Sequence, residues 1–219
     1  MNKSMMKSMR YVKRETSYYI RREPSDTVSM YRMAYFISKA KHKDIFKSGT
    51  GNPGTTNAFM NFGKAWGFLV LFCDVMKAFS AVKLCQSIFP TSSLAGVVAG
   101  CAAVVGHIFP FYMKFRGGKG IASFAGFIFA LDWKLFIVLL AAGGIVALIL
   151  NYGCGLSFTA AIMFPVLYAG EKHSIAAFLV LAVCSGAIIY RHMENVRKIR
   201  DGMEMPVRTF LKKYFLGRG

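Results

Sequence analysis

Three short polar segments interrupt a largely apolar sequence, and each carries residue types suited to binding phosphate. The first segment, residues 47–64, reads KSGTGNPGTTNAFMNFGK. Its four glycines allow positive φ angles and a close approach of the backbone to a ligand. Its Thr and Asn residues stand where an apolar helix begins, and the free N–H groups and dipole of a helix start favour an anion. The residues that carry this pattern are Gly49, Gly51, Gly54, Gly63, Thr55, Thr56 and Asn57.

The same segment approaches the nucleotide-binding P-loop pattern without completing it. Gly49 and Gly54 have the required spacing, but Thr55 and Thr56 follow them instead of Lys and Ser or Thr. Nucleotide hydrolysis is therefore excluded. A glycine-rich turn that only connects two elements is as common as one that binds phosphate, so this segment alone leaves both interpretations open.

The second segment, residues 114–123 (KFRGGKGIAS), surrounds one lysine with three glycines. Lys119 can bring a point charge to a phosphate oxygen while neighbouring amides donate hydrogen bonds. Ordinary charge between two membrane helices is the common alternative explanation. The placement of Gly117, Gly118 and Gly120 favours binding, because a simple charged anchor does not require them.

The third segment, residues 191–204 (RHMENVRKIRDGME), follows an apolar stretch and is rich in charge and hydrogen-bonding groups. Amide and carboxylate side chains bind hydroxyl groups, and Arg or Lys binds phosphate. Most of its cations are equally suited to anchoring at lipid headgroups. Asn195 and Glu204 are therefore the stronger candidates for a site.

The composition places these segments in a membrane protein. Apolar residues make up 55% of the 219 residues and charged residues only 17%, below the ~25% typical of soluble domains. The 28 Lys and Arg residues gather at the ends, with 12 in residues 1–47 and 8 in residues 191–219. Cations that flank an apolar centre bind the anionic cytoplasmic leaflet. A nucleic-acid-binding protein spreads its cations over a folded surface, so no nucleic-acid partner is expected.

Six apolar stretches qualify as membrane helices, since a hydrocarbon core of about 30 Å needs about 20 apolar residues, or fewer when neighbours shield the helix. The sequence therefore predicts an all-α, polytopic membrane helical bundle with about six transmembrane helices and no strands. An interfacial helix is expected near residues 28–40, and a disordered basic arm is an equal alternative for the outermost residues. The predicted organisation is a basic arm with the interfacial helix at 1–43, a membrane domain at 44–204 and a basic tail at 205–219. The six stretches are residues 65–89, 94–113, 121–131, 135–150, 156–169 and 175–190.

The number of stretches between the segments predicts that all three segments emerge on one face of the membrane. Two stretches separate the first segment from the second, and four separate the second from the third. An even number of crossings returns the chain to the same side. Both cationic ends share that side, whereas the opposite loops hold only Lys134 and Lys172, so the positive-inside rule makes the shared face cytoplasmic.

Asp74 and Lys77 lie within the first apolar stretch, three residues apart on one helix. A charge at the bilayer centre costs about 2.5 to 3.5 kcal/mol, so we expect these two side chains to be paired or to lie close to a cavity. A structural ion pair is the favoured role. His107 is interpreted as a hydrogen-bonded helix residue that is also placed to line a site near Lys119. The five cysteines form no CxxC pair and are expected to be reduced and structural.

Together the three segments resemble the motifs of the bacterial membrane acyl-phosphate:glycerol-3-phosphate acyltransferases. The first motif of that family reads like GSGNxGxTNxxRxxGK, the second like GHxFPxFxxFxGGKGVAT and the third like RHxENxxRxxxGxE. The corresponding residues here are 49–64, 106–123 and 191–204, and the DVMK sequence at 74–77 resembles the family's GDVxKG. Three linked motifs, in order and at natural spacing, make the resemblance specific.

The resemblance implies transfer of a fatty acyl group from acyl phosphate to the 1-hydroxyl of glycerol 3-phosphate, giving lysophosphatidic acid and phosphate. It implies a bacterial plasma-membrane protein whose site faces the cytoplasm, with acyl phosphate, glycerol 3-phosphate and membrane lipids as partners and with no cofactor or metal. It does not indicate an oligomeric state. The resemblance further implies that the leaving phosphate accepts the hydroxyl proton, which agrees with the lack of a GxSxG sequence and of any His followed five residues later by Asp. The implied catalytic residues are Thr50, Lys119 and Asn195. The implied substrate-binding residues are Gly49, Gly51, Asn52, Gly54, Thr56, Asn57, His107, Gly117, Gly118, Gly120, His192 and Glu204.

The sequence departs from the family pattern at several positions. Thr50 replaces a Ser and keeps its hydroxyl, Lys198 replaces an Arg, and Met60 replaces an Arg without keeping a charge. The region before the first segment is too charged to span, so six spans are predicted instead of the family's seven. Two other functions stay open: a divergent relative that binds phosphorylated lipid precursors without turnover or with altered specificity, which Met60 favours, and a small transporter. The transporter is disfavoured because neither half of the sequence repeats the other and only Asp74 and Lys77 are charges expected near the midplane.

Overall fold

The computed structural model describes residues 34, 37, 47, 52, 54–111, 115 and 117–215. The regular elements within these residues are α-helices, and no strand occurs among them. The predicted all-α fold is confirmed. The helices are α3 (Thr55–Phe62), α4 (Lys64–Ile88), α5 (Ala95–Ile108), α6 (Ile121–Leu131), α7 (Trp133–Leu150), α8 (Cys154–Glu171), α9 (Ile175–Arg200) and α10 (Val207–Tyr214).

Each of the helices α4 to α9 contains one of the six apolar stretches or most of it. α9 continues past its stretch to Arg200, so most of the third polar segment is helical instead of following the helix. Three of them, α7, α8 and α9, are long and apolar enough to cross a membrane, and α5 and α6 are shorter apolar helices. The count of six transmembrane helices stays a prediction. α5 ends at Ile108, earlier than the stretch from which it was expected, because Pro110 disfavours helical backbone at Phe109, whose φ and ψ are −122° and 61°.

Two described residues, Ala34 and Ile37, belong to the expected N-terminal interfacial helix. Both are helical and buried, and they pack with Ala58 of α3 and Val70 of α4. A spacing of three residues places them on one face of a helix. The remainder of residues 1–43 lies outside the described residues, so the division into arm, membrane domain and tail stays a prediction.

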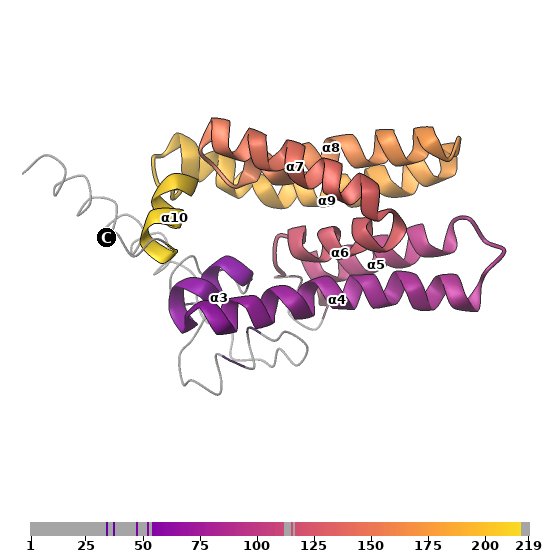
Figure 1. Ribbon diagram of the computed structural model, residues 1–219, viewed down its shortest axis with the longest axis horizontal. Helices are drawn as coiled ribbons and strands as arrows, with labels where there is room; N and C mark the ends of the chain where they lie inside the picture. Colours follow the sequence, from indigo (N-terminus) through magenta and orange to yellow (C-terminus); the bar gives the residue numbers. More distant parts are fainter. Residues whose placement is uncertain are drawn as a thin grey trace, which may run out of the picture.

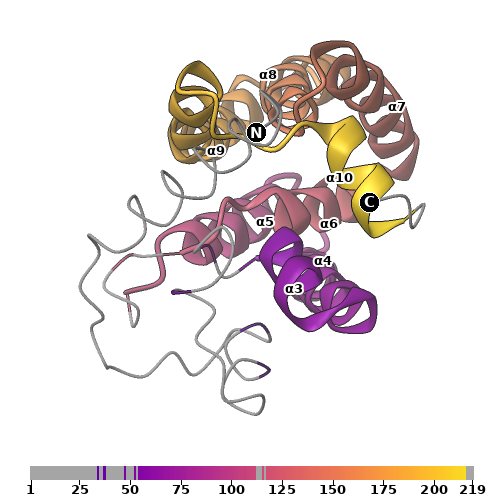
Figure 2. The ribbon, with the colours of Figure 1, turned by 90° about the vertical axis from the view of Figure 1, so that its left-hand side faces the viewer.

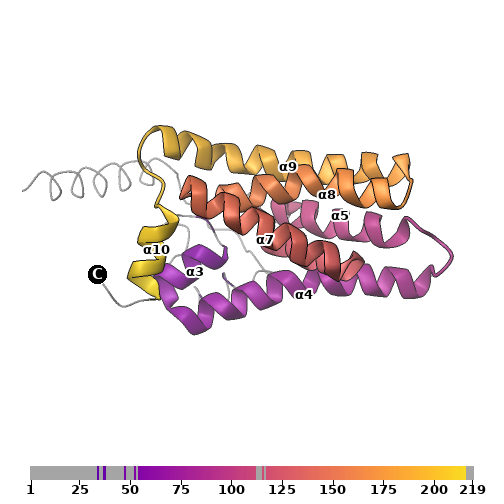
Figure 3. The same ribbon diagram turned by 45° about the horizontal axis from the view of Figure 1, so that its top comes forward.

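The helices form two layers along the long axis of the molecule (Figure 1). One layer contains α7, α8 and α9, and the other contains α3, α4, α5 and α6. Contacts of α5 with α9 and of α6 with α7 join the two layers. At one end of the bundle α10 lies across both layers, beside α3 (Figures 2 and 3).

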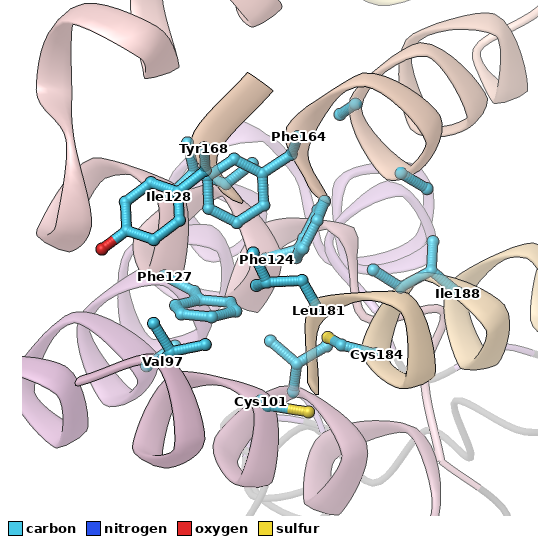
Figure 4. Packing of buried hydrophobic residues seen from close by; sticks show 14 of the residues in the cluster. Val97, Cys101, Phe124, Phe127, Ile128, Phe164, Tyr168, Leu181, Cys184 and Ile188 are labelled. Carbon is cyan, nitrogen blue, oxygen red and sulfur yellow. The ribbon is translucent and has the colours of Figure 1, made fainter. Parts of the chain in front are cut away.

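An aromatic cluster fills the space between the layers (Figure 4). Phe124 and Phe127 of α6 meet Phe164 of α8 edge to face, with ring centroids 5.6 Å and 5.8 Å apart. All three rings are fully buried. Such pairs contribute about 0.5 to 1.5 kcal/mol each beyond the burial of their area. They therefore hold the short helix α6 firmly against the opposite layer.

Side-chain caps define where two helices of the upper layer in Figure 1 begin. The carboxylate of Asp132 accepts the backbone N–H of Leu135 at 2.9 Å at the start of α7, and the hydroxyl of Ser174 accepts that of Ala177 at 3.2 Å at the start of α9. A cap of this kind contributes about 1 kcal/mol. These caps fix the register of the two helices whose opposite ends reach the site described next.

Candidate active site

The three polar segments meet in one pocket near the end of the bundle that α10 crosses. The pocket has a volume of about 350 Å³, within the range of about 300 to 1,000 Å³ typical of small-molecule sites. The segments therefore lie together, as the even number of helices between them predicts. Gly49, Thr50 and Gly51 lie outside the described residues. The predicted site residues that line the pocket are Asn52, Gly54, Thr56, Asn57, His107, Lys119, Gly120, His192, Asn195 and Glu204.

Two helices begin at the pocket wall with glycine as the N-cap residue. α3 starts after Gly54 and α6 starts after Gly120, and both glycines line the pocket. Glycine has no side chain to cap a helix, so neither N-cap residue satisfies the first-turn N–H groups of its own helix. Their dipoles add partial positive charge at the same place. The pocket is therefore suited to anions at two separate points of its wall.

The turn that carries Lys119 packs tightly against the end of α5. A Cβ atom at Gly117 would lie 2.1 Å from the carbonyl oxygen of Ile108, and one at Gly118 would lie 2.3 Å from Nε2 of His107. Gly120 has a φ of +85°. Gly117 and Gly118 thus lie behind the pocket wall, and the glycines serve close packing and a left-handed turn rather than flexibility of the lysine.

Arg191 of α9 holds this turn from the other side. Its Nη2 donates to the carbonyl of Gly117 at 2.9 Å, and its Nε donates to the carbonyl of Gly118 at 3.3 Å. The N–H of Gly118 donates to the carbonyl of His107 at 3.3 Å. The turn is therefore fixed between α5 and α9, and its conformation determines where Lys119 points.

Lys119 is a positive group without a direct ionic partner in the described part of the chain. It lines the pocket and forms no salt bridge or side-chain hydrogen bond with the described residues. Burial lowers the pKa of its ammonium group below the usual value, the nearby charge of Glu204 opposes this, and the cation of Lys198 lowers the pKa further. A bound phosphate would stabilise the charged form of Lys119.

Asn195 and Glu204, the preferred candidates of the third segment, are directly hydrogen-bonded. The Nδ2 of Asn195 donates to Oε1 of Glu204 at 2.6 Å. The Oδ1 of Asn195 and the Oγ1 of Thr55 are buried and have no hydrogen-bond partner among the described residues. Buried polar atoms without partners are costly, unless a ligand satisfies them. Both residues line the pocket, so these two atoms are candidates for contact with substrate.

His192 is buried and lines the pocket. Its Nδ1 lies 2.9 Å from the carbonyl oxygen of Ile188. Because a carbonyl oxygen only accepts hydrogen bonds, Nδ1 carries the proton, and Nε2 of the neutral ring is an acceptor. His192 can therefore accept a hydrogen bond from a hydroxyl group, but none of the described carboxylates is hydrogen-bonded to it in the way that activates a catalytic histidine.

A charged cluster lies where α4 and α5 reach the pocket. The Nζ of Lys77 lies 2.6 Å from Oδ1 of Asp74, which confirms the predicted ion pair. His107 joins it: its Nδ1 contacts Nζ of Lys77 and lies 3.5 Å from Oδ1 of Asp74. Both Asp74 and His107 line the pocket. His107 is therefore a hydrogen-bonded helix residue and a wall residue at once.

Sequence reasoning missed several residues of the pocket wall. Lys198 lies three residues after Asn195 on the same face of α9, a spacing that could have identified it, and its Nζ lies 3.4 Å from Oε1 of Glu194. Met60 also lines the pocket, so the position at which the family pattern has Arg faces the ligand space.

No group of three His, Cys, Asp or Glu side chains suited to a metal ion occurs in the described residues. Thr55 and Asp74, which the sequence singled out without assigning them to the site, also line the pocket. The other missed wall residues are Ile121, Ala122, Gly153, Cys154, Ser157, Met203, Met205, Val207 and Phe210.

The fold and the pocket define a helical membrane protein with a polar pocket, lined by Lys119, Asn195 and Glu204, at one end of its bundle. The model of the family described as "Glycerol-3-phosphate acyltransferase" matches residues 28–202. The chain therefore belongs to the glycerol-3-phosphate acyltransferase family.

Its relatives carry the same name. A glycerol-3-phosphate acyltransferase of Endomicrobium trichonymphae is 35% identical over 181 residues, covering 82% of this chain and 90% of the relative. Glycerol-3-phosphate acyltransferase 2 of Thermotoga maritima is 34% identical over 181 residues, covering 81% of this chain and 90% of the relative.

Two solved structures resemble the fold. The crystal structure of PlsY, an integral membrane glycerol 3-phosphate acyltransferase, in its glycerol 3-phosphate form has a TM-score of 0.72 and 30% identity, covering 79% of this chain and 86% of that chain. The lysophosphatidic acid form has a TM-score of 0.68 and 29% identity, covering 81% of this chain and 90% of that chain. These matches agree with the assignment of this chain as a membrane protein.

Proposed function

We propose that this protein transfers a fatty acyl group from acyl phosphate to the 1-hydroxyl of glycerol 3-phosphate and releases lysophosphatidic acid and phosphate. The observation that carries the proposal is the convergence of Lys119, Asn195 and two glycine-capped helix starts on one pocket. Both substrates bear a phosphoryl group, and the pocket offers two separate places for one. The glycerol 3-phosphate and lysophosphatidic acid forms of the related PlsY structures support the same substrate and product.

The two phosphoryl groups are assigned to the two helix starts. Lys119 and the first N–H groups of α6 bind the phosphate of glycerol 3-phosphate, and the start of α3 binds acyl phosphate. Asn195 accepts a hydrogen bond from a glycerol hydroxyl through Oδ1, which is unsatisfied among the described residues. Glu204 positions Asn195 by accepting from its Nδ2. Thr50 is proposed as the third catalytic residue. It belongs to the same motif as Asn52, which lines the pocket.

The reaction needs positioning more than a protein base. The hydroxyl oxygen attacks the carbonyl carbon of the acyl phosphate, the bond between that carbon and the phosphate oxygen breaks, and the hydroxyl proton passes to the leaving phosphate. Lys119 and the helix dipoles stabilise the negative charge that develops near them. His192 accepts a hydrogen bond from the second hydroxyl through Nε2 and orients the glycerol.

The proposed location is the bacterial plasma membrane, with the pocket at the cytoplasmic face. The pocket lies at the end of the bundle where the third segment and the cationic helix α10 are found. Lys172 lies in the turn between α8 and α9, toward the opposite end. The excess of cations at the pocket end supports a cytoplasmic orientation, which also gives soluble glycerol 3-phosphate access to the site.

The test is phosphate and lysophosphatidic acid formation from palmitoyl phosphate by the purified protein, with and without glycerol 3-phosphate. The wild-type chain is expected to form lysophosphatidic acid only when glycerol 3-phosphate is present. Lys119→Ala and Asn195→Ala are expected to lower the rate by roughly a hundredfold or more, as expected when a preorganised charge or hydrogen-bonding group is removed. Lys172→Ala, at an exposed cation away from the pocket, is the matched control. Full turnover by both pocket variants would refute the assigned site.

A second candidate function is binding of phosphorylated lipid precursors without turnover. The observation that favours it is Met60, an uncharged residue in the pocket wall where the family pattern has Arg. Binding of glycerol 3-phosphate measured by calorimetry, together with no product from palmitoyl phosphate, would support this function over catalysis.

A further inference from the structure

The helix α10 lies beyond the part of the chain that the family model matches. The match ends at residue 202 and α10 begins at Val207. Its Val207, Phe210, Leu211 and Tyr214 follow helical spacing and share one face, whereas cations occupy the opposite face. α10 is therefore an amphipathic addition to the matched region, and its contacts decide what it does.

One end of α10 is fixed to the end of α7. Asn151 caps α7 in the left-handed conformation, with a φ of 61°. Its carbonyl oxygen accepts the N–H of Val207 at 2.9 Å, and its side-chain Oδ1 accepts the N–H of Arg208 at 3.0 Å. A single residue thus ends one helix and satisfies two of the free N–H groups that begin another.

The other end of α10 is fixed to the opposite layer by aromatic contacts. The rings of Phe210 and Phe215 are 6.2 Å apart, and that of Phe215 lies 5.9 Å from Phe59 of α3. The ammonium of Lys64, the first residue of α4, lies 5.4 Å above the ring of Phe215. α10 therefore connects α7 to α3 and α4 across the end of the bundle (Figures 2 and 3).

The apolar face of α10 contributes directly to the pocket. Val207 and Phe210 line it, together with Met205 from the segment before α10 and Met60 from α3. These side chains offer no strong hydrogen-bonding group, whereas Lys119 and Asn195 line the same pocket with charge and amide groups. One part of the pocket wall can thus form hydrogen bonds with polar substrate groups, whereas the other part is apolar and would leave a polar group without a partner.

From this arrangement we infer that Phe210 of α10 excludes water from the reacting carbonyl and so selects glycerol 3-phosphate over water as the acyl acceptor. The inference rests on the proposed function. Water attack on acyl phosphate gives a fatty acid and phosphate, and glycerol 3-phosphate attack gives lysophosphatidic acid and phosphate. Both reactions break the bond between the carbonyl carbon and the phosphate oxygen, so only the acceptor differs. Closure of a site by apolar groups suppresses such hydrolysis.

The experiment measures fatty acid and lysophosphatidic acid formed together from labelled palmitoyl phosphate at one concentration of glycerol 3-phosphate, with the full chain in lipid vesicles. Phe210→Ala is expected to raise the ratio of fatty acid to lysophosphatidic acid by roughly tenfold, equivalent to about 1.4 kcal/mol between the two barriers. Phe210→Leu is expected to raise it less, because it keeps part of the apolar wall. Leu211→Ala removes the neighbouring side chain, which is 39% exposed, and is expected to leave the ratio unchanged.

The ratio separates this role from a loss of folding, because both products come from the same active molecules. An unchanged ratio in Phe210→Ala, whatever the total rate, would overturn the inference. Asn151→Gly removes the side-chain acceptor for α10 while allowing the positive φ, and it is expected to raise the ratio as Phe210→Ala does. If wild-type protein forms no lysophosphatidic acid at all, the proposed function itself fails, and the inference falls with it.

Discussion

Replacement of Arg191 by lysine tests whether this residue acts as a charge or as a positioning group. The guanidinium donates to two carbonyl oxygens of the turn that carries Lys119, at 2.9 Å and 3.3 Å. Lysine keeps the positive charge but cannot present two donors in a fixed fork. Arg191→Lys should therefore loosen the turn and misplace Lys119 without removing positive charge from the site.

The size of the effect follows from the two hydrogen bonds. A bond from a charged donor contributes about 1.5 to 3 kcal/mol. Arg191 is half-buried and its second bond is long, so we take about 2 kcal/mol for both, which corresponds to a loss of roughly 30-fold in kcat/KM. Because Lys119 is assigned to glycerol 3-phosphate, the KM for glycerol 3-phosphate should rise more than that for acyl phosphate.

The assay is steady-state kinetics of lysophosphatidic acid formation with each substrate varied in turn. Arg197→Lys, at an exposed arginine of the same helix, is the matched control and should behave as wild type. Arg191→Ala should lose somewhat more than Arg191→Lys, since it also removes the charge. Wild-type kinetics in Arg191→Lys would refute the positioning role and assign Arg191 to long-range attraction of substrate.

Three further predictions concern the pocket itself. Between the lowered pKa of Lys119 and the usual 10.5, the unfolded chain binds more protons than the folded chain. The free energy of unfolding should therefore rise with pH across this window, while glycerol 3-phosphate binding weakens. Melting and binding curves of Lys119→Met should lack both trends. Glu204→Gln keeps an acceptor for Asn195 but removes the charge that supports the Lys119 ammonium, so the alkaline loss of binding should move to lower pH, and an unmoved profile would contradict this coupling. Met60→Arg should lower the KM for acyl phosphate by roughly tenfold, as expected for a charge-assisted hydrogen bond of about 1.5 kcal/mol. An unchanged KM in the same steady-state assay would show that residue 60 does not contact the phosphoryl group.

Much of the fold was predictable because membrane helices are encoded locally. The six apolar stretches became α4 to α9, and counting them was enough to bring Asn52, Lys119 and Asn195 to one end of the bundle. Each stretch needs only its own composition to be recognised. Which residues of a helix face the pocket depends instead on how that helix packs. The sequence predicted that Asp74 is paired or close to a cavity, but it could not show that Asp74 and His107 lie together in the pocket wall.

The role of the glycines around Lys119 shows the same limit. Their placement favoured phosphate binding at Lys119, which stays a prediction, whereas the structure explains the glycines by contacts between distant parts of the chain. Gly117 and Gly118 meet the end of α5, and their carbonyls meet Arg191 of α9. A sequence pattern identifies that small residues are needed, whereas only the packing identifies the neighbours that require them.

The C-terminal residues were expected to be a basic tail because their cations dominate the composition. The apolar residues Val207, Phe210, Leu211 and Tyr214 carry a clear helical spacing that could have predicted α10. Its docking site could not be predicted, since it depends on the left-handed cap at Asn151 and on aromatic contacts with α3.

Met60 and α10 are best understood together. The position at which the family pattern has Arg lies in the pocket wall, and here it bears a thioether in a pocket that Phe210 also lines. An arginine beside an apolar wall would lose hydration unless it contacted a phosphate. Methionine packs against such a wall without the cost of desolvating a charge. The proposed function assigns the phosphoryl groups to Lys119 and the two helix starts, and this assignment does not require a cation at residue 60. On the proposed function, Met60 therefore belongs to the apolar part of the pocket wall, beside Phe210.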